Sequence, residues 1–378
     1  MPSVLETLAS LVSINSINPE WGGPGEGEVA DFVERFFSGG GVEVSRDEIL
    51  PGRENVMVRL AGSDSSRAIV LEAHMDTVSV DGMSIDPFDP RMEEGRMYGR
   101  GSCDVKAGLA SMMHAVREVS ESGNSPPCDV YLAAVVDEEH VYRGVLGALE
   151  WFRSRGIQPE SAVVAEPTEL RLVRANKGVL RWKIETRGVA AHSSKPHLGE
   201  NAISLMAEVI RRLDSHHDSL GDHEHPLLGP GTGSIGVIKG GDQVNFVPDR
   251  CSILLDRRLL PGESGLEIIA SYRALLHDLG ESVVVHDPDL LDEAMETPEG
   301  SLVVESARAV LEAMGRDSTP AGVPFGCDVT KFSRAGIPGI IFGPGSIDQA
   351  HGAVEFVDVK QVELAFDFYR RFLLNYGS

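Results

Sequence analysis

The chain has 378 residues, of which 42% are hydrophobic and 24% are charged. This composition is that of a globular protein, and the length exceeds what one hydrophobic core organises, so we expect two domains. The formal net charge is −24, and the sequence contains no lysine- and arginine-rich run, which argues against a nucleic-acid-binding protein.

The first 175 residues alternate between helical and strand patterns. Two helices are expected up to Phe37, on either side of a loop rich in glycine, proline and asparagine at Asn15–Gly27. They are followed by three buried strands and two helices: strands at Ala68–Ala73, Val130–Val136 and Ala162–Ala165, and helices at Val105–Ser122 and Val141–Arg155. This alternation predicts a mainly parallel sheet covered by helices.

The hydrophobic pattern changes near residue 176. Leu180–Gly188 alternates apolar and polar residues, which is typical of a half-buried strand. Further elements are then expected in the order helix, strand, strand, helix, strand: Asn201–Leu213, Thr232–Lys239, Arg250–Leu260, Gly265–Leu279 and Ser282–His286. The complete β-α-β-β-α-β order predicts a small α+β domain of the ferredoxin-like kind.

The earlier pattern returns from about Glu299, with helices at Ser301–Met314 and Val359–Asn375 and a buried strand at Gly339–Phe342. The predicted fold class is therefore α/β. A mainly parallel-sheet domain, formed by residues 1–175 and 289–378, is interrupted by a smaller α+β domain at residues 176–288.

The four cysteines are scattered and form no Cys-x-x-Cys pair, so neither a thiolate zinc site nor a disulfide framework is expected. The N-terminal residues lack the pattern of a secretory signal, and the sequence contains no apolar run of 18 residues. We therefore expect a cytoplasmic protein that does not associate with a membrane.

His74 and Asp76 follow the strand at Ala68–Ala73. Residues two apart in a strand point the same way, so both side chains can address one point beyond the carboxyl end of the strand. Open α/β sheets bind ligands at that edge, and a His-x-Asp pair suits a metal-ligating imidazole oriented by a carboxylate. Taken alone, the motif also fits a capped strand end.

Asp104 opens the helix expected at Val105–Ser122 and lies among the glycines of Gly99–Gly108. A helix cap explains an aspartate at this place. The alternative is that its two carboxylate oxygens bridge two cations.

Two further strands are also followed by acids, and a third is followed by a histidine. Glu138 and Glu139 come after Val130–Val136, Glu166 comes after Ala162–Ala165, and His351 comes after Gly339–Phe342. Neighbouring acids repel one another unless solvent or a cation offsets their charge, although acids also favour the first turn of a helix.

One sheet edge would thus hold two histidines and five carboxylates. Histidine and carboxylate without thiolate form the ligand set of hydrolytic zinc or cobalt. Six metal-binding groups predict two ions that share a bridging ligand, about 3.5–4 Å apart.

In this order the motifs resemble those of the zinc aminoacylase and metallopeptidase family, which includes acetylornithine deacetylase, succinyl-diaminopimelate desuccinylase, aminoacylase-1 and carboxypeptidase G. The resemblance covers essentially the whole chain, and Gly343–His351 is most similar to acetylornithine deacetylase. The motifs that carry it are His74–Val78, Gly101–Gly108, Asp137–Glu139, Ala165–Thr168 and Gln349–His351.

The resemblance implies two divalent ions, zinc or cobalt, whose ligand sets share an aspartate: His74, Asp104 and Glu166 for one ion, and Asp104, Glu139 and His351 for the other. It further implies that Glu138 is the general base for a metal-bridging water and that Asp76 orients His74.

Residues of the inserted domain and its surroundings are further candidates by resemblance. His192 and Asn245 would donate hydrogen bonds to the oxyanion, and Arg258 would hold the substrate carboxylate, a task that suits a guanidinium fork. Gly326 would lie in the substrate loop. Without the resemblance, His192 fits a surface loop, Asn245 a turn and Arg258 a solvated strand. The resemblance also implies that the larger domain is catalytic and that the inserted one is a lid or dimerisation domain. Because the inserted domain makes the subunit contact in dimeric members of the family, where the histidine acts across it, a homodimer is implied as well.

The implied function is a two-metal hydrolase of linear amides that deacylates an N-acyl amino acid, with acetylornithine or a similar N-acetyl basic amino acid as the leading substrate. Departures from the family pattern at Gly352–Phe356 and Gly326–Thr330 leave desuccinylation and carboxypeptidase or dipeptidase cleavage open. An inactive metal-binding or regulatory homologue is the alternative from another class, but mere ligation does not require Glu138. A nucleotide-binding protein is not supported, because Gly39–Gly41 is not followed by Lys-Ser/Thr.

Overall fold

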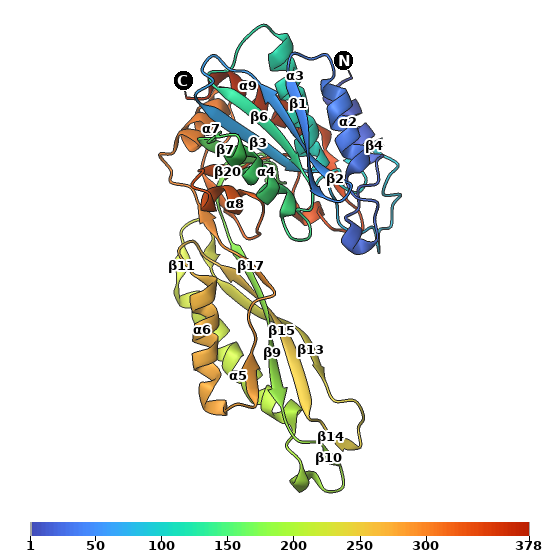
Figure 1. Cartoon of the computed structure of the whole chain (residues 1–378), viewed down its shortest axis with the longest axis vertical. Coiled ribbons are helices and arrows are strands. Elements are labelled where there is room, and N and C mark those ends of the chain that lie inside the picture. Colours follow the sequence, from blue (N-terminus) through green and yellow to red (C-terminus); the bar gives the residue numbers. More distant parts are fainter. Residues whose placement is uncertain (1, 378) are drawn as a thin grey trace. The chain divides into compact units, whose positions relative to one another are not determined.

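The computed structural model describes residues 2–377, which divide into two compact units (Figure 1). The second unit comprises Ala175–Glu296 and Gly322–Gly326, and the first comprises the rest of the chain. The limits predicted at residues 175 and 288 differ from this division in two places. Leu290–Asp292 (β17) pairs with a strand of the second unit, and Gly322–Gly326 also belongs to that unit. Both are short segments without a hydrophobic period, so the local pattern did not reveal them.

A nine-stranded sheet has a parallel centre made of four strands, in the order β6, β3, β7 and β20. Every residue of β3 and β6 is buried, as expected for strands that are covered on both faces. On either side of this centre, the pairs β1–β2, β2–β6, β8–β20 and β8–β18 are antiparallel. The predicted fold class is confirmed. The strands are β1 (Glu43–Leu50), β2 (Arg53–Leu60), β6 (Asp129–Val135), β3 (Ala68–His74), β7 (Ser161–Val164), β20 (Gly339–Ile341), β8 (Val173–Asn176) and β18 (Met295–Glu296), with β19 (Ala321–Val323) beside β8.

Helices cover both faces of this sheet (Figure 1). One face and its helices share a large apolar core. On the other face Tyr131 of β6 packs against Trp151 and Phe152 of α4. The helices of the first face are α1 (Val4–Val12), α2 (Gly27–Phe37), α3 (Lys106–Glu121), α7 (Leu302–Ala313) and α9 (Val359–Asn375), and those of the second are α4 (Arg143–Ser154) and α8 (Val329–Arg334).

A three-stranded antiparallel sheet completes the strands of the first unit. It joins β21 (Phe356–Asp358), β5 (Arg96–Tyr98) and β4 (Arg91–Glu93). Because β5 precedes Asp104 and β21 follows His351, this small sheet ties together two segments that carry predicted site residues.

The second unit has its own core beneath a five-stranded antiparallel sheet, in which β13, β15, β9 and β16 follow one another and β17 also pairs with β9. Trp182 and Tyr272 are the largest buried side chains of this core. The arrangement is the predicted ferredoxin-like one. Its main elements are β9 (Gly178–Arg187), α5 (Ala202–Ser219), β13 (Thr232–Gly240), β15 (Arg250–Leu259), α6 (Gly265–Leu276) and β16 (Val283–Val285), and two short ribbons are formed by β10 (Ala191–His192) with β14 (Phe246–Val247) and by β11 (Glu224–His225) with β12 (Gly229–Pro230).

All four cysteines are buried free thiols. Within residues 2–377, none of the helices combines the length and the apolar character that a membrane span requires.

His114 of α3 contacts two other helices of the first unit, α1 and α2. Its Nε2 atom forms a 2.8 Å hydrogen bond with Oγ1 of Thr7, and its ring packs against Phe36. Burial lowers the pKa of His114 from 6.5 to about 4, because an imidazolium is poorly solvated in an apolar core.

We expect this histidine to make the protein less stable in mild acid. Above pH 6.5 the residue is neutral in both states, but as the pH falls toward 4 the unfolded chain takes up a proton that the folded chain does not. His114→Leu should therefore flatten the fall in unfolding free energy between these pH values, as measured by urea denaturation. The exposed His223→Leu is the control, and equal pH slopes in the two variants would contradict the assignment.

Candidate metal centre

The parallel strands bring acidic and imidazole side chains to one edge of the sheet. His74 is the last residue of β3, Glu138 and Glu139 follow β6, and Glu166 follows β7. The carboxyl ends of parallel strands meet at the same edge, so these residues converge although as many as 92 positions separate them in the chain. The side chains of His74, Glu138 and Glu166 are almost completely buried.

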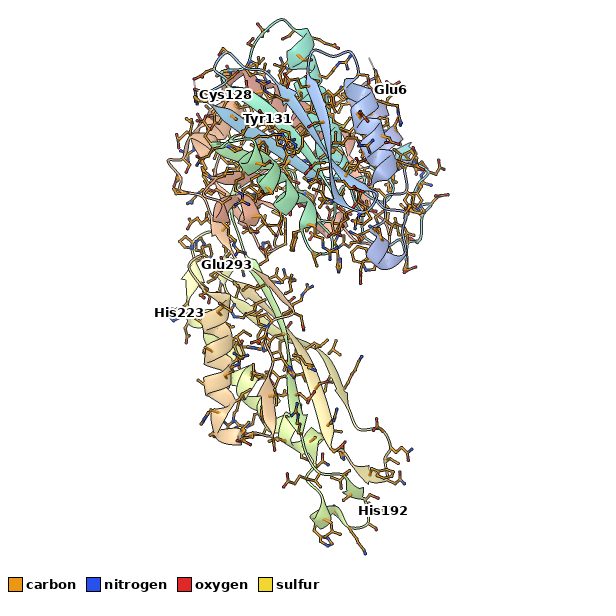
Figure 2. The ribbon with its side chains drawn as sticks, in the orientation of Figure 1. Glu6, Cys128, Tyr131, His192, His223 and Glu293 are labelled. Atoms are coloured by element: carbon orange, nitrogen blue, oxygen red, sulfur yellow. The ribbon has the colours of Figure 1, made fainter. Side chains whose placement is uncertain are left out.

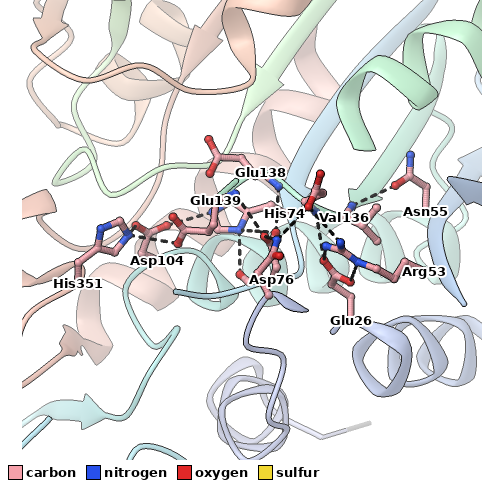
Figure 3. Close-up of polar contacts among 12 residues, drawn as sticks. Glu26, Arg53, Asn55, His74, Asp76, Asp104, Val136, Glu138, Glu139 and His351 are labelled. Atoms are coloured by element: carbon pink, nitrogen blue, oxygen red, sulfur yellow. Dashed lines mark hydrogen bonds and ion pairs between the residues drawn. The ribbon is translucent and has the colours of Figure 1, made fainter. Parts of the chain in front are cut away.

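Two groups of side chains place their potential ligand atoms within 4.8 Å of one another. Asp104 belongs to both groups: its Oδ1 lies 3.0 Å from Nε2 of His74, and its Oδ2 lies 3.3 Å from Nε2 of His351 (Figure 3). Each group has the composition that the sequence predicted for one ion: His74, Asp104 and Glu166 in one, and Asp104, Glu139 and His351 in the other. Their role as ligands stays a prediction.

The ring of His74 is oriented by the residue two positions further on. Its Nδ1 lies 3.0 Å from the carbonyl oxygen of Asp76 and 3.6 Å from the Asp76 carboxylate. Nδ1 therefore carries the proton and donates it to the carbonyl, which leaves Nε2 to face Asp104. This is the usual arrangement behind a metal-ligating imidazole.

Glu355 holds the backbone around Asp104. Its Oε1 accepts hydrogen bonds from the N–H groups of Cys103 (2.9 Å) and Asp104 (3.1 Å), and its Oε2 pairs with Arg100 at 2.5 Å. The role of Glu355 could not be predicted from the local sequence, because its partners lie about 250 positions earlier in the chain. The only local signal was its place four residues after His351.

Burial raises the pKa of Glu138, Glu139 and Glu166, and the neighbouring acids raise it further. Burial acts in the same direction on Asp104, but hydrogen bonds from His351 and His74 outweigh it and lower the pKa of that carboxyl. Hydrogen bonds to Asp104 and Glu139 raise the pKa of His351 to about 11. The raised pKa values of the three glutamates show that ionised carboxylates are costly together at low dielectric, and divalent cations would offset that cost.

The donor set fits zinc-type dications. It offers two imidazoles and several carboxylates, and these are the ligands of hydrolytic zinc. The nearby thiol of Cys103 instead donates to the carbonyl oxygen of Ser346 at 3.3 Å. Glu138 belongs to neither group, so its carboxylate is available for proton transfer.

The second unit brings the other candidates together in two separate pairs. His192 is exposed in β10 (Figure 2), where its Nδ1 forms a 2.8 Å hydrogen bond with Oγ of Ser194. The backbone carbonyl of Asn245 accepts a hydrogen bond from the N–H of Ser193 at 3.0 Å. His192 and Asn245 therefore lie side by side at the β10–β14 ribbon.

Arg258 and Gly326 meet at the other end of the same sheet. Arg258 lies opposite Val179 of β9, and its Nε donates to Asp256 at 2.8 Å. A side chain at Gly326 would contact Val179 at 3.2 Å. Because β9 ends at Arg187 before the chain reaches His192, the two pairs are separated by at least roughly 26 Å along the strand. One small substrate cannot contact both pairs of a single chain.

We expect the two groups of ligands to bind separable ions. His351→Ala removes a ligand of only one group, so metal content measured by elemental mass spectrometry should fall from two zinc equivalents to one. Asp104→Asn weakens a ligand shared by both groups and should lower the affinity for both ions. His192→Ala is the control and should retain two equivalents. Two tightly held ions in His351→Ala would disprove the assignment.

Residues 70–375 match peptidase family M20/M25/M40. The acetylornithine deacetylase of Vibrio campbellii is 30% identical, over 100% of this chain and 99% of the relative. The aminopeptidase PepT of Bacillus cereus has a similar structure, with a TM-score of 0.79 at 23% identity, over 99% of this chain and 98% of that one. The YXEP protein of Bacillus subtilis, a dinuclear metal-binding peptidase of the M20 family, gives a TM-score of 0.74 at 15% identity, over 98% and 96% of the two chains. At these identities the two structures establish the fold alone.

Proposed function

This chain belongs to peptidase family M20/M25/M40, as its motifs predicted, and we propose that within this family it removes the acyl group from an N-acyl amino acid. It is a metal-dependent hydrolase that acts on small amino-acid or peptide substrates. The leading substrate is acetylornithine or a similar N-acetyl basic amino acid, supported by the relatives named acetylornithine deacetylase. The observation that carries the proposal is the aspartate shared by two groups of side chains that could hold metal ions, with Glu138 next to Glu139 on a loop held by Asp76.

Two divalent ions, zinc or cobalt, would be held by the two groups that share Asp104. Such a pair of ions lowers the pKa of water and polarises an amide carbonyl. Glu138 accepts the proton of the attacking water and delivers it to the leaving amine. Burial raises the pKa of Glu138, which makes this carboxylate a better proton acceptor than an exposed one.

The remaining roles belong to the second unit. His192 and Asn245 offer hydrogen-bond donors to the negative oxygen that develops on the substrate. The guanidinium of Arg258 binds the substrate carboxylate, since its fork matches that group, and Gly326 lies at the same end of the sheet.

Desuccinylation and the cleavage of dipeptides or C-terminal residues are the alternatives within the family. They are supported by two departures from the family pattern, one at Gly326–Thr330, which resembles the substrate loop, and one directly after His351.

A panel assay tests the proposal. With cobalt-loaded enzyme we expect a higher kcat/KM for acetylornithine than for acetyl-lysine, succinyl-diaminopimelate or simple dipeptides. Glu138→Gln should lower kcat by at least about 100-fold, because it removes the proton acceptor, and should retain both metal equivalents. A preference for a succinylated substrate or for dipeptides would favour the alternative activities, and a fully active Glu138→Gln would refute the general base.

We also propose a homodimer in which His192 and Asn245 serve the partner's substrate. The separation of these residues from Arg258 along β9 supports this arrangement. The strand β13 supports it as well, since it lies at the edge of its sheet and exposes Val237 and Ile238. An open edge strand is suited to pairing with a second copy.

A mixing experiment distinguishes action across the dimer from action within one chain. Glu138→Gln and His192→Ala homodimers should each be nearly inactive. If His192 acts across a symmetric dimer, subunit exchange restores one intact site in each mixed dimer, or about a quarter of wild-type activity. If no activity returns once exchange is verified by native mass spectrometry, His192 does not act in the partner's site.

A further inference from the structure

The loop that carries Glu138 and Glu139 is held by side chains. After β6 ends, four consecutive backbone N–H groups of residues 136–139 point away from any strand partner, and each donates to a buried side chain (Figure 3). The pairs are Val136 with Asn55 at 3.0 Å, Asp137 with Glu26 at 3.1 Å, Glu138 with Asp76 at 3.1 Å, and Glu139 with Asp76 at 3.2 Å. The conformation of this loop therefore depends on where those acceptors are fixed.

Arg53 holds the carboxylate of Glu26, which is one of those acceptors, and the carboxylate of Asp137 in the loop itself. Its Nε and Nη2 bind the two oxygens of Glu26 at 2.7 and 2.5 Å, and its Nη1 binds Oδ1 of Asp137 at 3.1 Å. The side chains of Glu26 and Asp137 are completely buried, and that of Arg53 is 11% exposed. A guanidinium presents several donors in a rigid plane, so it can hold both carboxylates at once, whereas an ammonium group is a single point charge.

The contact continues to the residues behind the metal centre. Nδ2 of Asn18 donates to Oδ1 of Asp137 (3.0 Å) and to Oδ2 of Asp76 (2.7 Å). Asp76 in turn accepts the N–H groups of Glu138 and Glu139. A continuous set of polar contacts thus runs from the β1–β2 hairpin, which carries Arg53, to the loop with the general base.

The backbone at Asp137 needs this support. Its φ angle is 65°, in the left-handed region that a residue other than glycine keeps only when its surroundings hold it there. Arg53 and Asn18 hold the side chain of Asp137, and Glu26 holds its N–H group. The next two residues, Glu138 and Glu139, take their direction from this turn.

We propose that Arg53 is a positioning residue that, together with Glu26, sets the loop of residues 137–139 so that Glu138 faces the reacting centre and Glu139 reaches the ion shared with His351. The inference rests on the proposed two-metal hydrolysis. Its consequence for Glu139 is measurable without a substrate, because Glu139 lies 3.2 Å from His351 in one of the two ligand groups.

The test is Arg53→Lys, which keeps the charge and removes the planar fork. Contacts that orient metal ligands typically contribute about 10- to 100-fold to affinity or activity. We expect the affinity for one of the two cobalt ions to fall by about that factor in calorimetric titration, with the other ion unaffected, and kcat to fall by a similar factor with little change in KM.

The matched control is Arg59→Lys on the same strand. Arg59 also pairs with a buried carboxylate, Asp129, at 2.9 Å, and with the exposed Glu43, but it lies roughly 20 Å further along the strand. This variant should lose thermal stability without a change in cobalt affinity or kcat.

Three outcomes overturn the proposal. The first is Arg53→Lys with wild-type cobalt affinity and kcat, whatever its thermal stability. The second is an equal loss of both quantities in Arg59→Lys. If Arg53→Lys does not fold, Glu26→Gln takes its place in the test, because the amide oxygen of glutamine still accepts the N–H of Asp137. The third outcome is that neither variant folds, which would make the pair a requirement for folding. If the wild-type enzyme hydrolyses no N-acyl amino acid, the proposed function fails, and the cobalt titration still decides the role of Arg53.

Discussion

The carboxylate of Asp104 lies between two imidazoles, one on each oxygen, and the rest of the site is arranged around it. Several acids are buried within a few ångströms of this carboxylate, and burial raises the pKa of Glu138, Glu139 and Glu166. Like charges at low dielectric repel one another strongly unless positive charge is supplied. A centre of this kind is therefore built to accept cations, and its geometry must be held by parts of the chain that do not themselves bind the ions.

Those parts are of two kinds. The parallel strands bring His74, Glu139 and Glu166 to one edge, because buried strands such as β3 and β6 fix the starting points of the loops. Buried carboxylates then fix the loops themselves. Glu355 accepts hydrogen bonds from the N–H groups of Cys103 and Asp104. Asp76 accepts hydrogen bonds from those of Glu138 and Glu139. In both places an acid that binds backbone sets the direction of an acid that can bind metal.

The local sequence pattern predicted these features unequally. The mainly apolar runs of β3, β6 and β7 predicted the parallel centre, and the acids and histidines after the strands predicted which residues converge. The β1–β2 hairpin was missed, since Glu43–Leu50 is rich in charge and only partly buried. Its Arg53 pairs with Glu26 and Asp137, which lie 27 and 84 positions away in the chain. Contacts of that range depend on tertiary packing and leave no trace in hydrophobic periodicity. The same applies to β17 and Gly322–Gly326, which moved the limits of the second unit.

This difference also explains why the chemistry is easier to infer than the substrate. The side chains that could bind metal are mostly buried at strand ends. Their burial, their spacing in the sequence and their residue types together leave few alternative roles. The side chains that would choose an acyl group or an amino acid, such as His192 and Arg258, are exposed or half-buried in the second unit, where few neighbours constrain them. His192 and Arg258 lie near opposite ends of β9 and are too far apart to contact one small molecule. In the proposed homodimer, substrate choice would therefore depend on how units of two chains combine, and the pattern within one chain does not determine such a property.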